Sequence, residues 1–177
     1  MSDDFDEDAW RDRIRAHRSE KDRAFRSDPA LPTPNGADFE GLSYFPLDPA
    51  YRLTARVQWV RDPQTVALSA NSGPPIEYER VATFGFTLHD AHRVLAGFRS
   101  PGTADVLIPF NDETNGSETA GEGRYLVVAD LEDSTQTEAV LDFNLAYHPF
   151  CVYDGYVSAL PPDENDLDTG VRAGERL

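Results

Sequence analysis

The sequence predicts a mainly β fold, an antiparallel β-sandwich or barrel with one N-terminal α-helix. Three observations support this class. Apolar residues recur at helical spacing only over residues 7–26, whereas beyond residue 50 they alternate with polar residues in short segments. Gly, Pro, Asn and Asp separate these segments, and no helical pattern lies between them. A sandwich and a closed barrel give the same alternation, so the sequence leaves both open.

The predicted helix over residues 7–26 is amphipathic. Its apolar stripe at 3.6-residue spacing consists of Trp10, Ile14, His17, Ala24 and Phe25. Acidic residues crowd its N-terminal end, where the helix dipole favours anions: Asp3, Asp4, Asp6, Glu7 and Asp8. Pro29 disfavours helix at Asp28, and further prolines keep the chain extended. We therefore expect residues 1–36 to comprise an acidic head, this helix and a Pro-rich linker.

Six segments have the period-two alternation of half-buried strands. They span residues 51–60, 76–90, 93–98, 104–110, 124–131 and 138–144. HDAH, at residues 89–92, is predicted to be the turn of a hairpin. We expect residues 37–177 to form a single β domain, long enough to bury a sizeable core. Its extended C-terminal tail from Pro161 is polar and is expected along the surface, where Leu167 and Val171 could pin it.

The composition is strongly acidic. There are 32 acidic residues against 16 basic ones, the formal net charge is -16, and Lys21 is the single lysine. Such a composition is typical of a halophilic protein, since a Debye length of about 3 Å in molar salt screens self-repulsion. An ordinary acidic protein is the alternative. The charge argues against nucleic acid and anionic membranes as partners, because both are bound by Lys/Arg patches.

The sequence carries no membrane or export signal. No run of about 18 apolar residues is present. The start, MSDDFDEDAW, is acidic where a signal peptide would be positive, and a single cysteine fits a reducing compartment. We therefore expect a cytoplasmic protein. GxSxG, HExxH, P-loop and GxGxxG motifs do not occur, so the sequence identifies no cofactor, and it leaves the oligomeric state open.

Residues 110–124, FNDETNGSETAGEGR, form a loop that is long for a hairpin. Its spacing partly matches a calcium-binding loop, but the first position is Asn111 and the flanks are strands, which argues against an EF-hand. One interpretation is a polar loop with positive φ at Gly116, Gly121 and Gly123. The other is an anion or ligand loop whose donors are backbone N–H groups, Thr114, Ser117, Thr119 and Arg124.

Residues 141–151, LDFNLAYHPFC, combine several reactive side chains at a strand end. Asp142 and Asn144 fall on one face, about 6.6 Å apart, so they could reach one bound group; a solvent-facing strand side is the alternative. His148 and Cys151 lack a third and fourth metal ligand, so no metal site is predicted. They would have to touch to form a nucleophilic pair, and a lone Cys is more often a small buried hydrophobe.

Several collinear motifs carry a family resemblance. EGLSYFPLDPAYR, FNDETNGSETAGEGRYL, VLDFNLAYHPFCVY, LPPDENDL and VRAGER follow one another along residues 40–177. In order and spacing they resemble the uncharacterised family called domain of unknown function 1684, in a short, haloarchaeal form that lacks a segment between the helix and the first motif. Three positions depart from the family pattern: Ala120 replaces Tyr, His148 replaces Asn, and Ser158 replaces a second Cys. A paired-cysteine disulfide or metal site is therefore not expected.

The resemblance implies which polar residues form the family signature, and no activity. The ligand-binding candidates are Asp112, Thr114, Arg124, Asp142, Asn144, Tyr147, His148, Cys151, Asn165 and Glu175. They would either line a pocket or form a buried network that holds long loops. In either case we expect Arg124 to pair with Asp142.

Three functional hypotheses follow. The first is a binding module in which loops 110–124 and 142–151 form one pocket for a small polar or anionic ligand. The second is a hydrolase-like enzyme in which Asp112 or Asp142 is the general base and His148 a proton shuttle. The third is a structural or partner-binding domain with the acidic helix as its contact surface.

Overall fold

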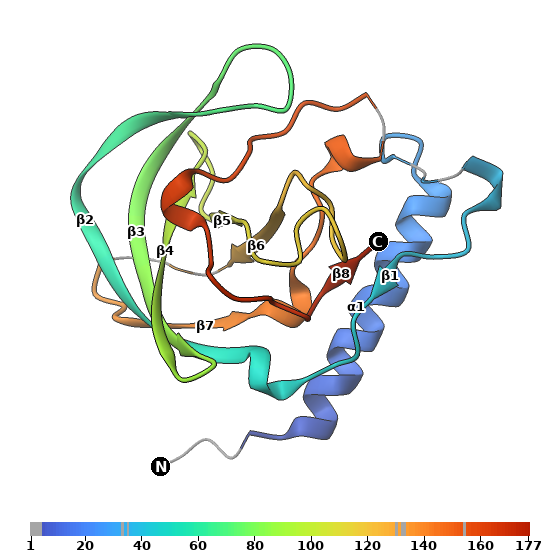
Figure 1. Cartoon of the computed structure of the whole chain (residues 1–177), viewed down its shortest axis with the longest axis horizontal. Helices are drawn as coiled ribbons and strands as arrows, with labels where there is room; N and C mark the ends of the chain where they lie inside the picture. The colour runs from blue at the N-terminus through green and yellow to red at the C-terminus, as the bar shows by residue number, and fades with distance from the viewer. Residues whose placement is uncertain (1–4, 33, 35, 130, 132–133, 154) are drawn as a thin grey trace.

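The fold is a curled antiparallel sheet with one long helix laid along it, as a computed structural model of the chain shows (Figure 1). The structure describes residues 5–32, 34, 36–129, 131, 134–153 and 155–177. The predicted mainly β class with an N-terminal helix is confirmed, and the sheet forms a half-barrel. The predicted acidic head lies partly outside the described residues, since Asp3 and Asp4 belong to residues 1–4.

Helix α1 spans Glu7–Ser27, close to the predicted range. Asp6 caps it by accepting a hydrogen bond from the Ala9 N–H, and acidic residues occupy the first turn. Of the predicted stripe, Trp10, Ile14 and Phe25 are buried, whereas His17 is exposed. Within the described chain, this helix is not long and apolar enough to cross a membrane.

Six strands form the main sheet in the order β6-β5-β4-β3-β2-β7. Their bounds are β2 Arg52–Leu68, β3 Ile76–Leu88, β4 Ala91–Arg99, β5 Val106–Phe110, β6 Arg124–Val128 and β7 Glu138–Asp142. Strands β6 and β7 are the two edges, and no hydrogen-bonded ladder joins them in the described part of the chain. The half-barrel therefore has an open seam. A separate pair, β1 Ser43–Tyr44 and β8 Glu175–Arg176, joins the C-terminal tail to the segment after α1.

The hairpin between β3 and β4 is closed by the predicted HDAH turn. His89 and Asp90 have φ values of 48° and 59°. Two consecutive positive φ angles are those of a type I′ turn, which matches the twist of the flanking strands.

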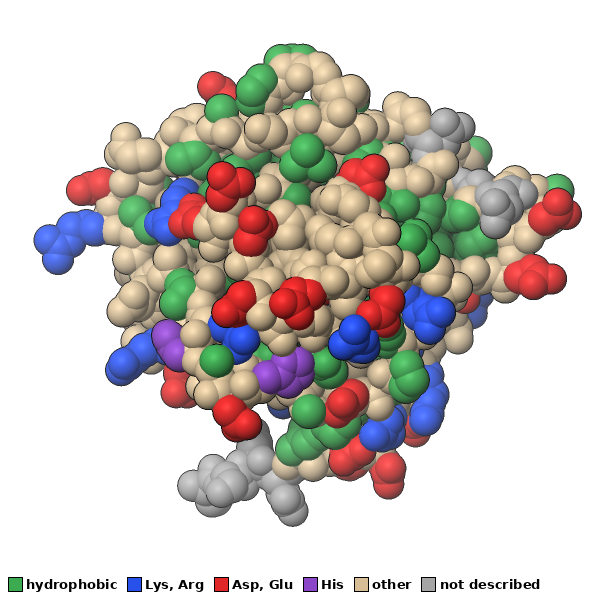
Figure 2. Space-filling view, in the orientation of Figure 1, with side chains coloured by type: hydrophobic (Ala, Val, Ile, Leu, Met, Phe, Trp, Pro, Cys, Tyr) green, Lys and Arg blue, Asp and Glu red, His purple; other side chains and the backbone are tan. Residues whose placement is uncertain are grey.

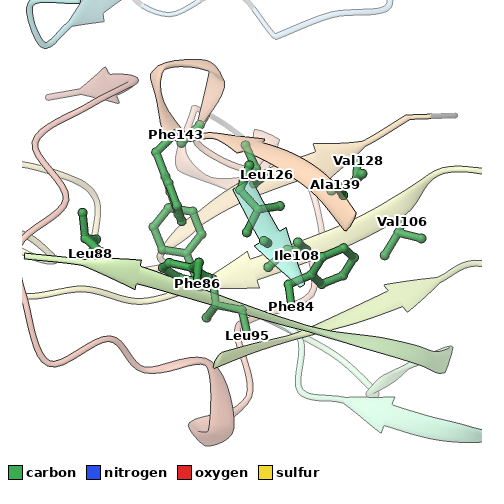
Figure 3. Packing of buried hydrophobic residues seen from close by; sticks show 14 of the residues in the cluster. Phe84, Phe86, Leu88, Leu95, Val106, Ile108, Leu126, Val128, Ala139 and Phe143 are labelled. Atoms are coloured by element: carbon green, nitrogen blue, oxygen red, sulfur yellow. The ribbon is translucent and has the colours of Figure 1, made fainter. Parts of the chain in front are cut away.

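The core fills the inner face of the half-barrel. Alternate residues of the strands point into it, as Figure 3 shows for Phe84, Phe86, Leu95, Ile108 and Leu126. The C-terminal tail belongs to the same core cluster through Leu167, Val171 and Ala173, of which the last two are fully buried. The expectation of a surface tail is therefore corrected: the two pinning residues are buried, and the tail covers one end of the half-barrel because its apolar side chains complete the core.

Candidate functional site

Arg124 and Asp112 form a buried ion pair at the centre of the signature. Both side chains are 0% exposed, and Arg124 Nη2 donates to Asp112 Oδ2 at 2.7 Å. The guanidinium also donates to the carbonyls of Val171, Ala173 and Glu175. Burial lowers the pKa of Arg124, and the adjacent Asp112 opposes that shift. This arginine therefore ties the tail to β6, which is the buried-network interpretation of the signature.

The expected pair of Arg124 with Asp142 does not form. On β6, Arg124 shares the inward face with Leu126 and Val128 of the core. On β7, Leu141 is fully buried in that core, so the alternation turns Asp142 to the outer side of the wall. The two side chains therefore lie on opposite faces of the half-barrel wall. Arg124 instead forms its ion pair with Asp112 of the 110–124 loop.

Asp142 and Asn144 join the strand end to α1. The Trp10 indole N–H donates to Asp142 Oδ2 at 2.6 Å. Asp142 Oδ1 accepts from both the backbone and the side-chain amide of Asn144. Asn144 in turn accepts from the Asp48 N–H and donates to the Asp48 carbonyl. The two residues do share a local network, as their spacing predicted, but its hydrogen bonds lie within the chain.

Glu175 is a second junction of buried polar groups. It is 1% exposed and forms an ion pair with Lys21 of α1. Its Oε2 also accepts from the His148 backbone N–H and from the Tyr153 hydroxyl. The single lysine therefore fastens the helix to the tail. Gly174, just before Glu175, has φ 78°, and a Cβ there would lie 2.5 Å from the Ala146 carbonyl oxygen, so this position requires glycine.

His148 is buried and neutral. Its Nε2 accepts a hydrogen bond from the Ala120 N–H, and its Nδ1 lies 3.7 Å from Glu175 Oε2. Burial, followed by the charges of Arg124 and Lys21, lowers the pKa of His148 to about 4. Because Nε2 is already an acceptor, a second ring proton would face the Ala120 N–H. This histidine is thus held away from the proton-shuttle state at neutral pH.

The remaining candidates also have partners within the chain. Asn165 bonds the backbone of Ala96 and the carbonyl of Pro109. Thr114 bonds the hydroxyl of Thr119 inside the 110–124 loop. Cys151 is half-buried, and burial raises the pKa of its thiol. Within the described residues, no three His, Cys, Asp or Glu side chains converge on a metal-sized site.

A cavity lies at the open seam, against the N-terminal half of α1. We call it the seam groove; its volume is about 530 Å³. Its lining residues come from α1, both edge strands, the start of β2 and the segment after β7: Trp10, Arg13, Ile14, His17, Arg52, Val127, Val140, Asp142, Leu145 and Tyr147. Asp142 and Tyr147 are thus the predicted site residues that border this open space.

The seam groove is apolar with a basic rim. Val127, Val140 and Leu145 are 41%, 44% and 37% exposed, which is unusual for aliphatic side chains on one surface. In the described part of the chain, the guanidinium groups of Arg13 and Arg52 form no ion pair or hydrogen bond. The Arg52 guanidinium instead lies 4.7 Å from the centre of the Phe5 ring. The groove therefore presents two cationic groups beside apolar surface, in a chain whose net charge is -16.

The sequence alone did not identify the basic and apolar groups of this groove. One signal was present: Val127 and Val140 occupy outward positions of their strands, where a polar residue is expected on a solvent-facing side. Arg13 and Arg52 gave no such signal, because they come to line one groove only when α1 packs over the seam.

A second cavity of about 310 Å³ contains His148, Tyr153 and Glu175. Asp142 borders the seam groove and not this cavity, and Asp112 borders neither. The three groups of the hydrolase hypothesis are therefore not gathered around one open space in the described structure.

Comparison with known proteins gives a family and a related structure. A family model described as "Protein of unknown function (DUF1684)" matches residues 37–176. The solution NMR structure of the uncharacterized protein from gene locus rrnAC0354 of Haloarcula marismortui is similar, with 38% sequence identity, 98% coverage of each chain and a TM-score of 0.76. No curated protein gives a match. The match over nearly the whole β region, together with the signature motifs, shows that the chain belongs to the DUF1684 family.

Proposed function

We propose that the protein is a binding module whose seam groove takes a small amphipathic anion, such as a medium-chain carboxylate. The observation that carries the proposal is a pair of arginines that form no ion pair with another described residue, beside exposed aliphatic side chains in the seam groove. A volume of about 530 Å³ falls within the range of small-molecule sites, about 300–1,000 Å³.

The basic rim favours a negatively charged group. Arg13 and Arg52 present guanidinium groups that no acidic side chain of the described chain neutralises. Asp142 is the one carboxylate in the lining, and both of its oxygens already accept hydrogen bonds from Trp10 and Asn144. A guanidinium binds a carboxylate through two parallel hydrogen bonds, so a ligand carboxylate suits this rim.

The apolar floor favours a hydrocarbon body. Val127 and Val140 come from the two unjoined edge strands, and Ile14 comes from the helix above them. Covering such side chains removes apolar surface from water, at about 25 cal/mol per Å². A ligand with an apolar chain would therefore bridge the seam that the sheet leaves open.

Binding fits the geometry better than hydrolysis does. Asp112 is neutralised by Arg124, and His148 is held neutral with one nitrogen already an acceptor. A general base needs a free lone pair within reach of its substrate. The polar signature residues thus support the wall and the tail, and the groove beside them supplies the open surface.

The test is a titration of octanoate that is followed by Trp10 fluorescence. Trp10 lines the groove, and Trp59 is the only other tryptophan, so a Trp59→Phe background isolates the signal. We expect saturable binding of octanoate and weaker binding of 1-octanol, which has the same chain without the charge. The Arg13→Gln, Arg52→Gln double variant should weaken octanoate binding about tenfold, the effect of losing charge-assisted hydrogen bonds.

The matched control is Arg61→Gln, an exposed arginine further along β2 and outside the groove. It changes the net charge in the same direction and should leave the affinity within about twofold of the parent, because exposed charges are screened by salt. Equal affinities for octanoate and octanol, or an unaffected double variant, would sink the anion proposal.

A further inference from the structure

A separate cavity, lined largely by aromatic rings, shares Tyr147 with the seam groove. We call it the aromatic pocket; its volume is about 200 Å³. It is lined by residues of β6 and of the segment that follows β7: Tyr125, Tyr147, Pro149, Phe150, Tyr156, Val157 and Ser158. Four of these seven residues are aromatic, which sets it apart from the aliphatic seam groove.

The four rings are arranged at steep angles to each other. Tyr125 and Tyr147 have ring centres 5.7 Å apart at 86°, and Phe150 and Tyr156 have centres 5.6 Å apart at 73°. Each pair is therefore in edge-to-face contact, an arrangement that aromatic rings prefer. The pocket is therefore bounded by ring surfaces in several orientations.

The hydroxyl groups of two of these tyrosines form hydrogen bonds with backbone carbonyls. The Tyr125 hydroxyl donates to the Ala159 carbonyl, and the Tyr156 hydroxyl donates to the Ala30 carbonyl. Burial raises the pKa of Tyr125, and it raises the pKa of Tyr147 to about 12. The rings are thus neutral and presented by their hydrocarbon surfaces, whose faces carry the negative end of the aromatic quadrupole.

One ring of the set already attracts a cation. Lys21 Nζ lies 4.6 Å from the centre of the Tyr147 ring. Its charge is offset by the ion pair with Glu175, so it does not leave a net positive charge beside the pocket. The molecule as a whole has a net charge of -16. This charge favours the binding of cations over anions at surfaces that carry no arginine.

In the described structure, the lack of acidic side chains in the lining limits the chemical class of cation that the pocket could bind. No carboxylate, amide or basic side chain is among the residues that line the pocket in the described structure. A primary ammonium or a metal ion needs such acceptors to replace its water. A quaternary ammonium has no N–H group and an apolar methyl surface, so aromatic faces alone can hold it.

From these contacts we infer that the aromatic pocket binds a small methylated ammonium ion, a ligand class independent of the anion proposed for the seam groove. The cation would rest against Tyr125, Phe150 and Tyr156, with Tyr156, 36% exposed, at the entrance.

The experiment is a titration of choline chloride into ¹⁵N-labelled protein, followed by amide shifts at residues 147–158. The parallel ligand is 3,3-dimethyl-1-butanol, which has the shape of choline without the charge. We expect saturable shifts with choline and binding of the neutral analogue at least about fivefold weaker, the contribution of a cation–π contact at a partly exposed site. Ethanolamine, a primary ammonium, should also bind more weakly than choline.

Variants at the entrance test the rings directly. Tyr156→Leu should weaken choline binding about fivefold or more, whereas Tyr156→Phe, which keeps the ring, should retain it. The matched control is Phe5→Leu. Phe5 is 42% exposed, against 36% for Tyr156, and its ring lies beside Arg52 of the seam groove, away from the aromatic pocket. Unshifted amides in β2–β4 report that each variant is folded.

Equal affinity for the neutral analogue, an unaffected Tyr156→Leu variant or the lack of saturable shifts would each overturn the inference. Because octanoate binding is read at Trp10, failure here leaves the seam-groove proposal standing, and the converse also holds.

Discussion

At the scale of single residues, the signature side chains act as ties between distant segments. Arg124 joins β6 to the tail, Asn144 joins the end of β7 to Asp48, and Glu175 joins the tail to α1. Buried polar groups of this kind stay in place because an unpaired one costs about 1–3 kcal/mol or more. The burial of these side chains is therefore accounted for by their hydrogen bonds within the chain, without any need for a ligand at each one.

His148 gives a prediction for the pH dependence of stability. Its pKa is about 4 in the folded chain and its ordinary value is 6.5, so between these values the unfolded chain binds more protons. Stability is therefore lost as the pH falls through this window, by about 2 kcal/mol between pH 7 and pH 5 from this residue alone.

Replacing His148→Asn should remove most of that loss. The measurement is the free energy of urea unfolding at pH 7 and pH 5, with His92→Asn as a control because His92 is exposed on β4. If the difference between the two pH values is the same in both variants, His148 is not the group that titrates.

At the scale of elements, the tail from residue 161 completes the half-barrel. Leu167, Val171 and Ala173 enter the core, and three tail carbonyls accept hydrogen bonds from Arg124. Helix α1 rests on the tail in turn, through Lys21 and Glu175. The tail thus links the core to the helix.

A chain that ends after Gly170 should therefore fail to form the native fold. It would leave the Arg124 guanidinium buried without its carbonyl partners, and removing the partners of a buried charge costs about 3–5 kcal/mol, a large share of a domain's total stability. Amide dispersion in a ¹H–¹⁵N spectrum reports the outcome. Removal of Leu177 alone, which is 60% exposed, should keep the dispersed spectrum. A native spectrum from the shorter chain would contradict the proposed role of the tail.

The strands were predictable because their pattern is local. The helix and five of the strand ranges agree with the structure to within a few residues. Strand β2 is the exception, since it runs to Leu68 and the prediction ended at residue 60. Its pairing with β3 shifts register between Trp59 and Gln64, around Pro63, and its outer half loses the apolar alternation. A strand that is solvated on both sides gives no period-two signal.

The partners of the site residues were less predictable, because they depend on which face of the curled sheet each side chain occupies. Counting the alternation outward from Leu126 and Leu141 would have separated Arg124 from Asp142, but nothing local points to Asp112 as the partner. Predicting the seam groove would also have required the packing of α1 across two strands that are not neighbours in the sheet.

At the scale of the whole molecule, charge is spread over the surface. Figure 2 shows acidic side chains distributed over the visible face with basic ones between them. Two arginines of α1 donate to backbone carbonyls and form no ion pair with another described residue: Arg18 to Phe45 and Asn144, and Arg26 to Glu40. Much of the acidic excess is therefore left without a nearby cation.

We predict that salt stabilises the fold. Raising KCl from 0.1 M to 1 M shortens the Debye length from about 10 Å to about 3 Å and screens the repulsion among unpaired carboxylates. The thermal midpoint should rise over this range, and most of the gain should come below about 1 M, because the screening is then nearly complete. Differential scanning calorimetry measures the midpoint, with sucrose as an uncharged control. A midpoint that does not change with KCl would show that self-repulsion is not a significant cost in this chain.

The position of the tail also has a consequence for the order of synthesis. Residues 171–175 are translated after every strand of the main sheet, yet they hold the carbonyls that Arg124 requires and the carboxylate that receives Lys21. While these residues are still inside the ribosomal exit tunnel, the emerging half-barrel has an open end and α1 lacks its ion pair with Glu175. The nascent chain therefore exposes its apolar interior until residues 171–175 have left the exit tunnel, and the half-barrel closes only after all of its strands have been synthesised.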